Sequence, residues 1–446
     1  MTFPVHGRMF GRMERRISMW NVLIMFLFFA LLLQTMPVYA ENPFADLENG
    51  IAASTTKDPF ADLSVKNSPG TASGPAAVET TTPARARRTR TFLRQELYDQ
   101  VSWREGGDEP YRRLSYGGEV LQRFSDDVKT WGSFDAQVRL VHRAAYLPTL
   151  NDAEGESRSD WFLEYHNLYF DRFNALDAFL SPEARAKNLG KFNVRLGRFY
   201  LPSGLNLQTD THGTLLQLSN ERNFGFERDW YAGFWGALTH DLNYDLYAMA
   251  GSGYDLRLEG QKGLLGLRVS LAGKYLYDKG WEGGVSIVTG ERISEHTLMR
   301  SPRVAALADG GRFIETRRIG LDARHTKPVS RGTMTYTGEW TAGRDEEDTI
   351  YTQLYQMDLL RRDRRLGYAL QYRRFFQDIG AGPMPAMGAP DPGNADASLI
   401  GEVTWYFRND IGNSNLHWLK LNVEHQLERQ TGRPALVTTL QYYRYW

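Results

Sequence analysis

Apolar and polar residues alternate with a period of two along most of the chain beyond Arg90. In the segment SFDAQVRLVHR, Phe134 and Val138 lie on one face and Asp135 and Arg139 on the other. Successive side chains of a strand point to opposite sides, so each such segment has one apolar and one polar face. The same pattern recurs in KFNVRLG, GLLGLRVSLAG, RIGLDAR, TMTYTGEW and GEVTWYF. The chain is therefore predicted to be all-β.

Fifteen strands are clear from this alternation. We expect them at residues 113–124, 132–143, 161–172, 191–200, 230–239, 242–253, 264–272, 281–289, 316–325, 333–342, 349–360, 365–376, 398–407, 416–428 and 435–446. Segments of about ten residues separated by turns have the length that a tilted membrane strand needs.

The links between these strands are unequal in length, and the inequality follows a rule. The long links are 144–160, 201–229, 290–315 and 377–397, and the shortest are 240–241 and 361–364. If Trp446 lies in the periplasm, strands counted backwards from the C-terminus alternate in direction. Every one of these long links then lies on the extracellular side, and both of the shortest links lie on the periplasmic side. Bacterial outer-membrane barrels have this arrangement, whereas a soluble β-sandwich has no reason to follow it.

The same count requires one more strand before residue 113. The stretch TFLRQELYDQVSW at residues 91–103 is the only candidate, although its alternation is poor and its Glu and Gln content suits a helix. With it, we expect a closed antiparallel transmembrane β-barrel of 16 strands, with 14 or 18 as alternatives. Both termini would then lie in the periplasm, with the barrel in the cell outer membrane.

Composition excludes several kinds of site. The 446 residues contain no cysteine, which excludes disulfides, cysteine-ligated zinc, iron–sulfur clusters and covalently attached haem. No cofactor and no metal are expected. The mean hydropathy of −0.47 would suggest a soluble protein, but only alternate residues of a barrel strand meet lipid.

The N-terminal region is predicted to have two parts that precede a barrel at residues 91–446. Residues 1–40 combine arginines, a short apolar run and a small-residue stop, as in a secretory signal peptide. Their removal deletes four arginines and one glutamate and leaves 49 basic and 52 acidic residues, which argues against nucleic acid as a partner. Residues 41–90 form a polar linker, predicted to be disordered, in which PFADL occurs twice. Phe44 and Phe60 could anchor a periplasmic partner there, or the repeat could be duplicated linker.

The chain ends on the aromatic segment QYYRYW. Leu440, Tyr442 and Trp446 are predicted to share one face of the last strand, with Trp446 at the periplasmic interface. This ending resembles that of outer-membrane barrels as a group, in which a final aromatic is read by the barrel assembly machinery. Arg444 departs from the usual aromatic or apolar residue two positions before the end.

A second resemblance concerns the segment VRLGRFYLPSG at residues 194–204. It is similar to the segment that leads into the third outer loop in porins of the phosphate-selective and general-diffusion superfamily of Gram-negative bacteria. The resemblance implies that this loop folds into the barrel and narrows the pore. It also implies a homotrimer, and a location in the outer membrane brings lipid and lipopolysaccharide as neighbours.

The candidate pore site combines wall arginines with charged residues of the third outer loop. Opposed charges across a constriction filter solutes by charge and size, but a loop packed over the rim is an alternative. Carboxylates share the wall, so phosphate selectivity is not inferred. The predicted pore-lining residues are Arg139, Arg195, Arg198, Asp210, His212, Glu221, Arg222, Glu227, Arg228, Arg268, Arg324 and Arg373.

The sequence thus predicts a porin for small hydrophilic solutes or ions. The alternative is a structural barrel that sheathes or docks a periplasmic cytochrome or an exported polymer through the N-terminal repeat. An enzyme is not expected, because His142 and His166 lack a matched nucleophile or carboxylate geometry.

Overall fold

The computed structural model describes residues 88–446 apart from several links. The gaps are 108–109, 127–128, 145–159, 206–215, 217–223, 225–227, 252–262, 294–312, 379–394, 411–414 and 430–433. The predicted signal peptide, the PFADL repeat and its Phe44 and Phe60 lie outside the described residues. The last three residues of the predicted linker, 88–90, belong to the first strand.

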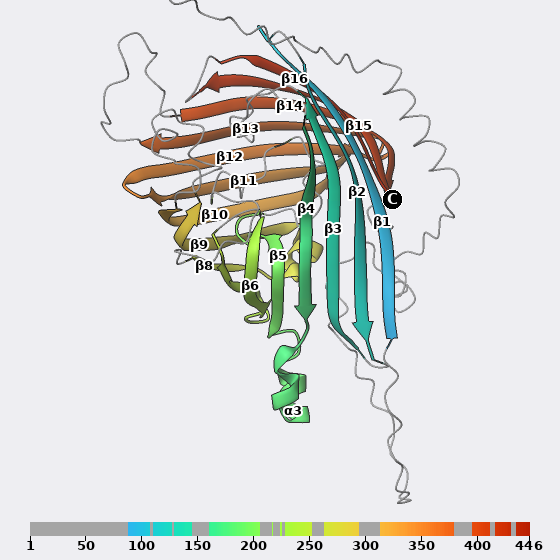
Figure 1. The fold of residues 1–446 in the computed structure, drawn as a ribbon, viewed down its shortest axis with the longest axis vertical. Coiled ribbons are helices and arrows are strands. Elements are labelled where there is room, and N and C mark those ends of the chain that lie inside the picture. The colour runs from blue at the N-terminus through green and yellow to red at the C-terminus, as the bar shows by residue number, and fades with distance from the viewer. Residues whose placement is uncertain are drawn as a thin grey trace, which may run out of the picture. The chain divides into compact units, whose positions relative to one another are not determined.

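Sixteen strands form one closed sheet in which every pair is antiparallel and neighbours in sequence are neighbours in space (Figure 1). The predicted sixteen-stranded closed antiparallel barrel is confirmed. The strands are β1 (Arg88–Arg104), β2 (Tyr111–Ser125), β3 (Thr130–Ala144), β4 (Asp160–Arg172), β5 (Asn193–Tyr200), β6 (Arg228–Ala237), β7 (Leu242–Met249), β8 (Leu264–Leu271), β9 (Trp281–Ile293), β10 (Phe313–Val329), β11 (Gly332–Asp345), β12 (Asp348–Arg361), β13 (Leu366–Asp378), β14 (Ala395–Asp410), β15 (Asn415–Glu428) and β16 (Leu436–Tyr445).

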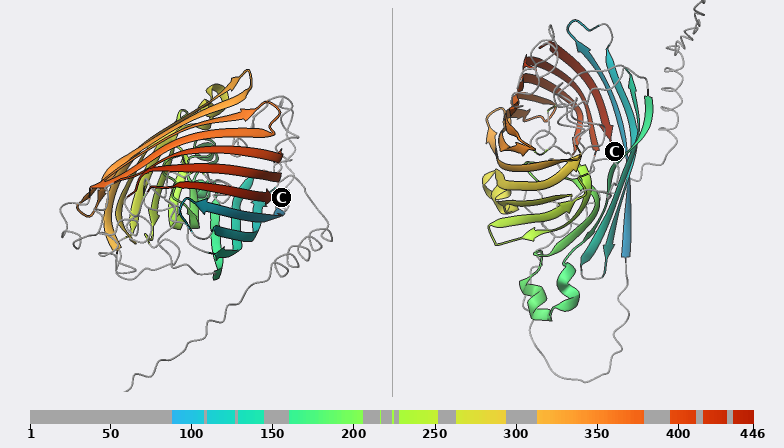
Figure 2. Two further views of the ribbon diagram at one scale, coloured as in Figure 1. Left: turned by 90° about the horizontal axis from the view of Figure 1, so that it is seen from above. Right: turned by 60° about the vertical axis from the view of Figure 1, so that its left-hand side comes forward.

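The first and last strands pair with each other and close the barrel; in the left view of Figure 2 the C-terminal end lies beside the blue first strand. β1 pairs with β16 from Glu96 opposite Tyr445 to Arg104 opposite Val437. Gln95 and Trp446 exchange backbone hydrogen bonds of 2.8 and 3.1 Å. The weak segment 91–103 is therefore a full strand, because pairing on both sides satisfies its backbone groups whatever its own alternation.

The two faces of the wall have opposite chemistry. In β10, Ile319 and Leu321 are about half exposed on the outside, whereas Arg318 and Asp322 are buried on the inside. This is the reverse of a soluble protein, in which apolar side chains face the core. An apolar outer surface and a polar interior suit a wall whose outside contacts lipid. Among the described residues, no helix is long and apolar enough to cross a membrane.

The link between β4 and β5 departs from the expected short turns. It occupies residues 173–192 and carries a 3-10 helix, η2 (Ala175–Phe179), and a helix, α3 (Pro182–Lys187). The side chains of Asn174 and Asn193 fix its base. Asn193 Oδ1 accepts from Asn174 N–H at 2.9 Å, and Asn174 Oδ1 accepts from Gly190 N–H at 2.7 Å. A second helix, α5 (Gly273–Lys279), lies between β8 and β9 at the same end of the barrel.

Strands β5, β7 and β8 are shorter than expected, and β6 has the expected length but begins two residues earlier. These four strands contain eight to ten residues, as β16 does with ten, whereas the remaining strands contain 13 to 17. The predicted strand at 242–253 ends at Met249, and Ala250 donates only a single hydrogen bond back to β6. The alternation of the sequence continues beyond Met249. The pairing of β7 with β8 ends there, because Met249 is opposite Leu264, the first residue of β8.

Candidate pore-lining site

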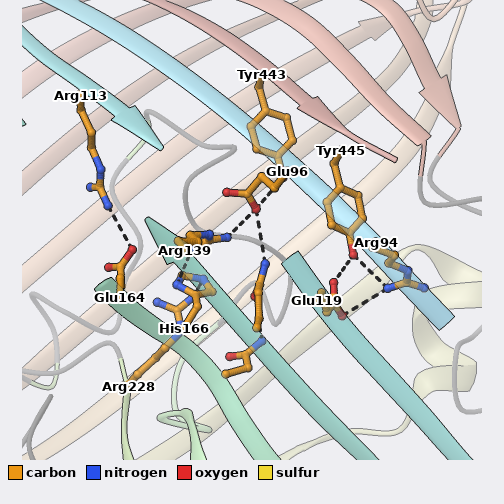
Figure 3. A network of polar contacts seen from close by, with 12 residues as sticks. Arg94, Glu96, Arg113, Glu119, Arg139, Glu164, His166, Arg228, Tyr443 and Tyr445 are labelled. Atoms are coloured by element: carbon orange, nitrogen blue, oxygen red, sulfur yellow. Dashed lines mark hydrogen bonds and ion pairs between the residues drawn. The ribbon is translucent and has the colours of Figure 1, made fainter. Parts of the chain in front are cut away.

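A buried ion pair joins the first strand to the third on the inner face of the wall. Arg139 Nη2 donates to Glu96 Oε2 at 2.6 Å, and both side chains are almost wholly buried. Gln137 and Tyr443 also donate to this carboxylate, at 3.4 and 3.5 Å. Glu96 therefore connects inward-facing residues of β1, β3 and β16 (Figure 3).

The network continues from Arg139 through a histidine. Arg139 Nη1 lies 2.5 Å from His166 Nδ1, and His166 Nε2 contacts Arg228. The Arg228 guanidinium also donates to the Tyr200 hydroxyl and lies 3.8 Å from the centre of its ring. A single imidazole thus bridges two guanidinium groups, as Figure 3 shows, and the polar chain extends from β16 to β6.

Most of the other wall arginines are paired with carboxylates of nearby strands. Arg195 forms a bidentate pair with Asp171 at 2.7 and 2.9 Å, and Arg268 forms one with Asp322 at 2.5 and 2.8 Å. Such paired geometry fixes the guanidinium and offsets its charge. The remaining pairs are Arg94 with Glu119, Arg113 with Glu164, Arg292 and Arg318 with Asp345, Arg324 with Glu282, Arg373 with Glu424, and Lys420 with Glu402.

The described beginning of the link between β5 and β6 lies against inward-facing residues of distant strands. Ser203 Oγ is 2.6 Å from the hydroxyl of Tyr247 on β7, and Gly204 N–H donates to Ser286 on β9 at 3.1 Å. Leu205 N–H donates to Glu339 on β11 at 3.3 Å. Residues 201–205 therefore run along the inner side of the wall and not over its rim.

An apolar cluster accompanies this segment inside the barrel. Leu201 and Phe224, both from the link, are fully buried and pack with inward-facing Tyr231, Tyr247 and Leu264. An added Cβ at Gly320 of β10 would lie 2.6 Å from the Phe224 ring, so the glycine makes room for it. The burial of the cluster stabilises the link against β6 to β10, since each large apolar side chain contributes about 1.5–3 kcal/mol when buried.

The predicted site residues fall into two groups. Arg139, Arg195, Arg198, Arg228, Arg268 and Arg373 are buried on the wall, and Arg324 is partly exposed. Arg198 donates to the backbone carbonyl oxygen of Tyr165 at 3.0 Å. The charged loop residues Asp210, His212, Glu221, Arg222 and Glu227 lie outside the described residues.

Sequence reasoning did not select Glu96 or Tyr200, which complete the network. Arg94, Glu96 and Tyr98 are spaced two residues apart and therefore share one face of the first strand. This spacing could have identified Glu96 as an inward-facing residue, although the alternation of the strand is weak. Leu440 and Tyr442 lie on the opposite side of β16 from the buried Tyr443, so they face outward.

Comparisons with known proteins support the fold. No family model and no curated protein sequence matches the chain. The structure of OprB from Pseudomonas putida at high pH is similar to it with a TM-score of 0.53 at 11% identity, over 80% of this chain and 94% of that one. OmpT with loop L8 deleted, from Vibrio cholerae, gives a TM-score of 0.47 at 9% identity over 80% and 99% of the two chains. The anion-selective porin from Comamonas acidovorans gives 0.46 at 11% identity over 80% and 100%. The similarity to OprB, whose TM-score exceeds 0.5, together with the closed sheet of sixteen strands, shows that the chain has the fold of a porin-like outer-membrane barrel.

Proposed function

We propose that the barrel is a water-filled channel through which small hydrophilic solutes or ions diffuse across the outer membrane. The observation that carries the proposal is the polar inner face of a closed sixteen-stranded wall. Barrels of this size enclose more space than wall side chains alone fill. Because most wall arginines are paired with carboxylates, we expect weak charge selectivity and not a strong preference for anions.

The link between β5 and β6 narrows this channel. Support comes from the contacts of residues 203–205 with Tyr247, Ser286 and Glu339. These three residues lie on the inner face of β7, β9 and β11, which are two, four and six strands away from β5 in the sheet. A link held in this way occupies the side of the lumen lined by β6 to β10. Solutes then pass along the polar inner face of β12 to β16 and β1 to β3.

Single-channel recording in planar bilayers tests both statements. The full chain should form steady, ohmic channels, and deletion of residues 206–222 should raise the conductance of each. Deletion of residues 380–393, in another long link, is the matched control and should leave the conductance nearly unchanged. A folded barrel that does not conduct would refute the channel, and an unchanged conductance after the first deletion would refute the constriction.

We also propose that both ends of the chain lie in the periplasm. The tight turns 330–331 and 362–365 share the end of the barrel at which Trp446 lies, whereas the long links 145–159, 294–312 and 379–394 share the other end. The ordered link 173–192 is an exception at the first end. Protease sites inserted at 363 and at 386 distinguish the orientations, because only the second should be cut in intact cells.

An outward-facing ion pair supports an oligomer, for which we propose a homotrimer. Arg112 and Asp99 form a bidentate pair at 2.9 and 3.2 Å, on the opposite side of their strands from the buried Tyr98 and Tyr111. A charge on the lipid face of a barrel costs about 2–4 kcal/mol at the membrane centre, so a contact between protomers is a better environment. Replacement of both residues by leucine should shift the trimer towards monomer on a semi-native gel.

The matched control is the outward pair formed by Arg374 and Glu428, which joins β13 to β15. Its arginine is as exposed as Arg112, and its carboxylate is more exposed than Asp99. Its replacement by leucines should leave the trimer intact. An unchanged trimer in the first double variant would contradict the assignment of the interface to β1 and β2.

A further inference from the structure

A cavity of about 510 Å³ lies at the end of the barrel where the tight turns lie, on the inner side of the wall. In the sheet, Pro328 is opposite Thr333, and Thr333 is opposite Leu360. Pro328 and Thr333 lie an even number of residues from Asp322 and Glu339 of the same strands, which are buried on the inner face. The lining residues are Pro328, Val329, Gly332, Thr333, Leu360, Arg361, Arg362, Arg364, Asn409 and Asp410.

The two turns that border this cavity carry excess positive charge. Residues 330–331 and 361–365 contain five arginines and one acidic residue, Asp363, which pairs with Arg361 at 3.2 Å. Within the part of the chain that the structure describes, the other four arginines form no ion pair. Asp410 is the one acidic residue of the lining. Five arginines against these two aspartates give the rim of the cavity a net charge of +3.

Backbone hydrogen bonds hold the two turns together. Arg362 N–H donates to the carbonyl oxygen of Arg331 at 3.0 Å, and Arg364 N–H donates to the carbonyl oxygen of Arg361 at 2.8 Å. The arginines are therefore presented from a fixed backbone. The apolar lining residues beside them are Pro328, Val329 and Leu360. A ligand that fits both parts of the cavity carries negative charge next to an apolar group.

The repeated PFADL sequence of the N-terminal region has this composition. In its second copy, at residues 58–63, Asp58 and Asp62 each lie two positions from Phe60. In the first copy Asn42 takes the place of the first aspartate. Residues 42–63 contain four acidic residues and one lysine, and their net charge of −3 complements that of the cavity rim.

The second copy is attached close enough to reach the cavity. Asn409 is opposite Leu416 on β15, which is opposite Tyr445 on β16. Tyr445 is opposite Glu96 on β1, so three strand spacings, about 14 Å, separate Asn409 from β1. Arg88 begins β1 eight residues before Glu96, which adds about 27 Å along the strand and gives a total separation of about 30 Å. A flexible chain of the length between position 63 and position 88 spans about 25–30 Å on average.

We propose that this cavity binds residues 58–63 of the same chain. Phe60 contacts the apolar lining, and Asp58 and Asp62 pair with Arg362 and Arg364. The mixed lining favours this segment over a small anion, because a small anion gains nothing from the apolar side. Attachment to β1 also keeps the segment at a high effective concentration beside the cavity. The bound segment covers part of the mouth of the barrel at this end.

Disulfide trapping tests the proposal, because the chain has no cysteine of its own. The variant F60C/L360C of the full chain is oxidised under mild conditions in lipid vesicles, and the bond is identified by mass spectrometry after digestion. It should form rapidly within one chain. The matched control is F60C/K187C, whose second substitution lies at an exposed position of α3 at the same end of the barrel. The control should form its bond far more slowly.

Charge variants distinguish specific docking from random collision. R362Q/R364Q, added to F60C/L360C, should slow bond formation between about twofold and thirtyfold, since two exposed ion pairs are lost. R362K/R364K keeps the charge and should retain most of the rate. D58N/D62N should slow the reaction as R362Q/R364Q does, and the combination of all four changes should slow it no further, because the same contacts are removed.

Three results would overturn the proposal. They are equal rates in F60C/L360C and F60C/K187C, a bond between two protomers in place of one within the chain, and full additivity of the two sets of charge changes. Heat-modifiable gel migration shows that each variant is folded before it is compared.

The effect on conduction rests on the proposed channel and is measured separately. Oxidation of F60C/L360C should lower the single-channel conductance, and reduction should restore it. Bond formation requires no conduction, so a silent barrel that forms the bond would refute the channel and support the docking. A bond that leaves the conductance unchanged would contradict the covering of the mouth.

Discussion

The buried pair of Glu96 and Arg139 offers a sharp test of how the wall is stabilised. Glu96→Gln preserves the shape of the side chain but removes the charge that faces the guanidinium at 2.6 Å. Both side chains are at most 2% exposed, so water cannot replace the lost carboxylate. Breaking a buried ion pair by removing one partner costs about 3–5 kcal/mol. We expect the free energy of unfolding to fall by this amount.

A more exposed ion pair provides the comparison for the stabilising effect of burial. Arg324 and Glu282 are one quarter to one third exposed, and their pair should contribute less than about 1 kcal/mol. Glu282→Gln is therefore the matched control. Unfolding is measured by urea titration of the barrel in lipid vesicles, followed by tryptophan fluorescence and by heat-modifiable gel migration. The double variant E96Q/R139Q should regain part of the loss, because no charge then remains buried without its partner.

The outcome separates two explanations for the wall network. If Glu96→Gln costs no more than Glu282→Gln, burial does not strengthen the pair and the reasoning is refuted. If the costs of Glu96→Gln and Arg139→Gln simply add in the double variant, the two groups do not interact energetically.

Three further predictions test the lipid face, one turn and one surface charge. Leu321→Arg, on the outer face of β10, should destabilise the barrel in vesicles by about 2–4 kcal/mol, whereas Leu321→Ala should cost less, as urea titration will show. Gly280 ends α5 with φ of 70°, and an added Cβ would lie 1.9 Å from a backbone oxygen. Gly280→Ala should therefore lower the free energy of unfolding by at least about 1 kcal/mol. Gly401→Ala is the control and should not lower it, because a Cβ at Gly401 would have no atom within 4 Å. The hydrogen bond with Lys274 holds the pKa of Asp241 below its ordinary value of 3.8. Its contribution to stability is therefore complete above that value and is lost as pH falls below it, and the difference between the original chain and Asp241→Asn should disappear in acid unfolding curves there.

The sequence was informative about the strands because their pattern is local. Ile319, Leu321, Arg318 and Asp322 reveal two faces of β10 without knowledge of any neighbour, and the structure confirms that strand and the barrel that contains it. The first strand was harder to identify, because Gln95 and Asp99 interrupt its apolar face. Its place is fixed by pairing with β16, more than 330 residues away in the chain.

The candidate site depended on information that the sequence does not contain. Glu96 and Arg139 are 43 positions apart, and Arg268 and Asp322 are 54 apart, so each ion pair depends on the register between strands. A shift of register by one residue would move every partner to the other face. Leu205 and Glu339 are 134 positions apart in the chain, and five strands, β6 to β10, lie between β5 and the strand that carries Glu339.

The sequence by itself determined that this protein is a barrel with an apolar outside and a polar inside. Alternation revealed the two-faced strands, since the period of two is a property of the extended backbone, and the order of long and short links separated a barrel from a sandwich. The tertiary structure alone decided which arginine meets which carboxylate and where residues 201–205, at the start of the link after β5, lie. These features follow from closure of the sheet, because register and strand tilt are properties of the whole ring and not of any one strand.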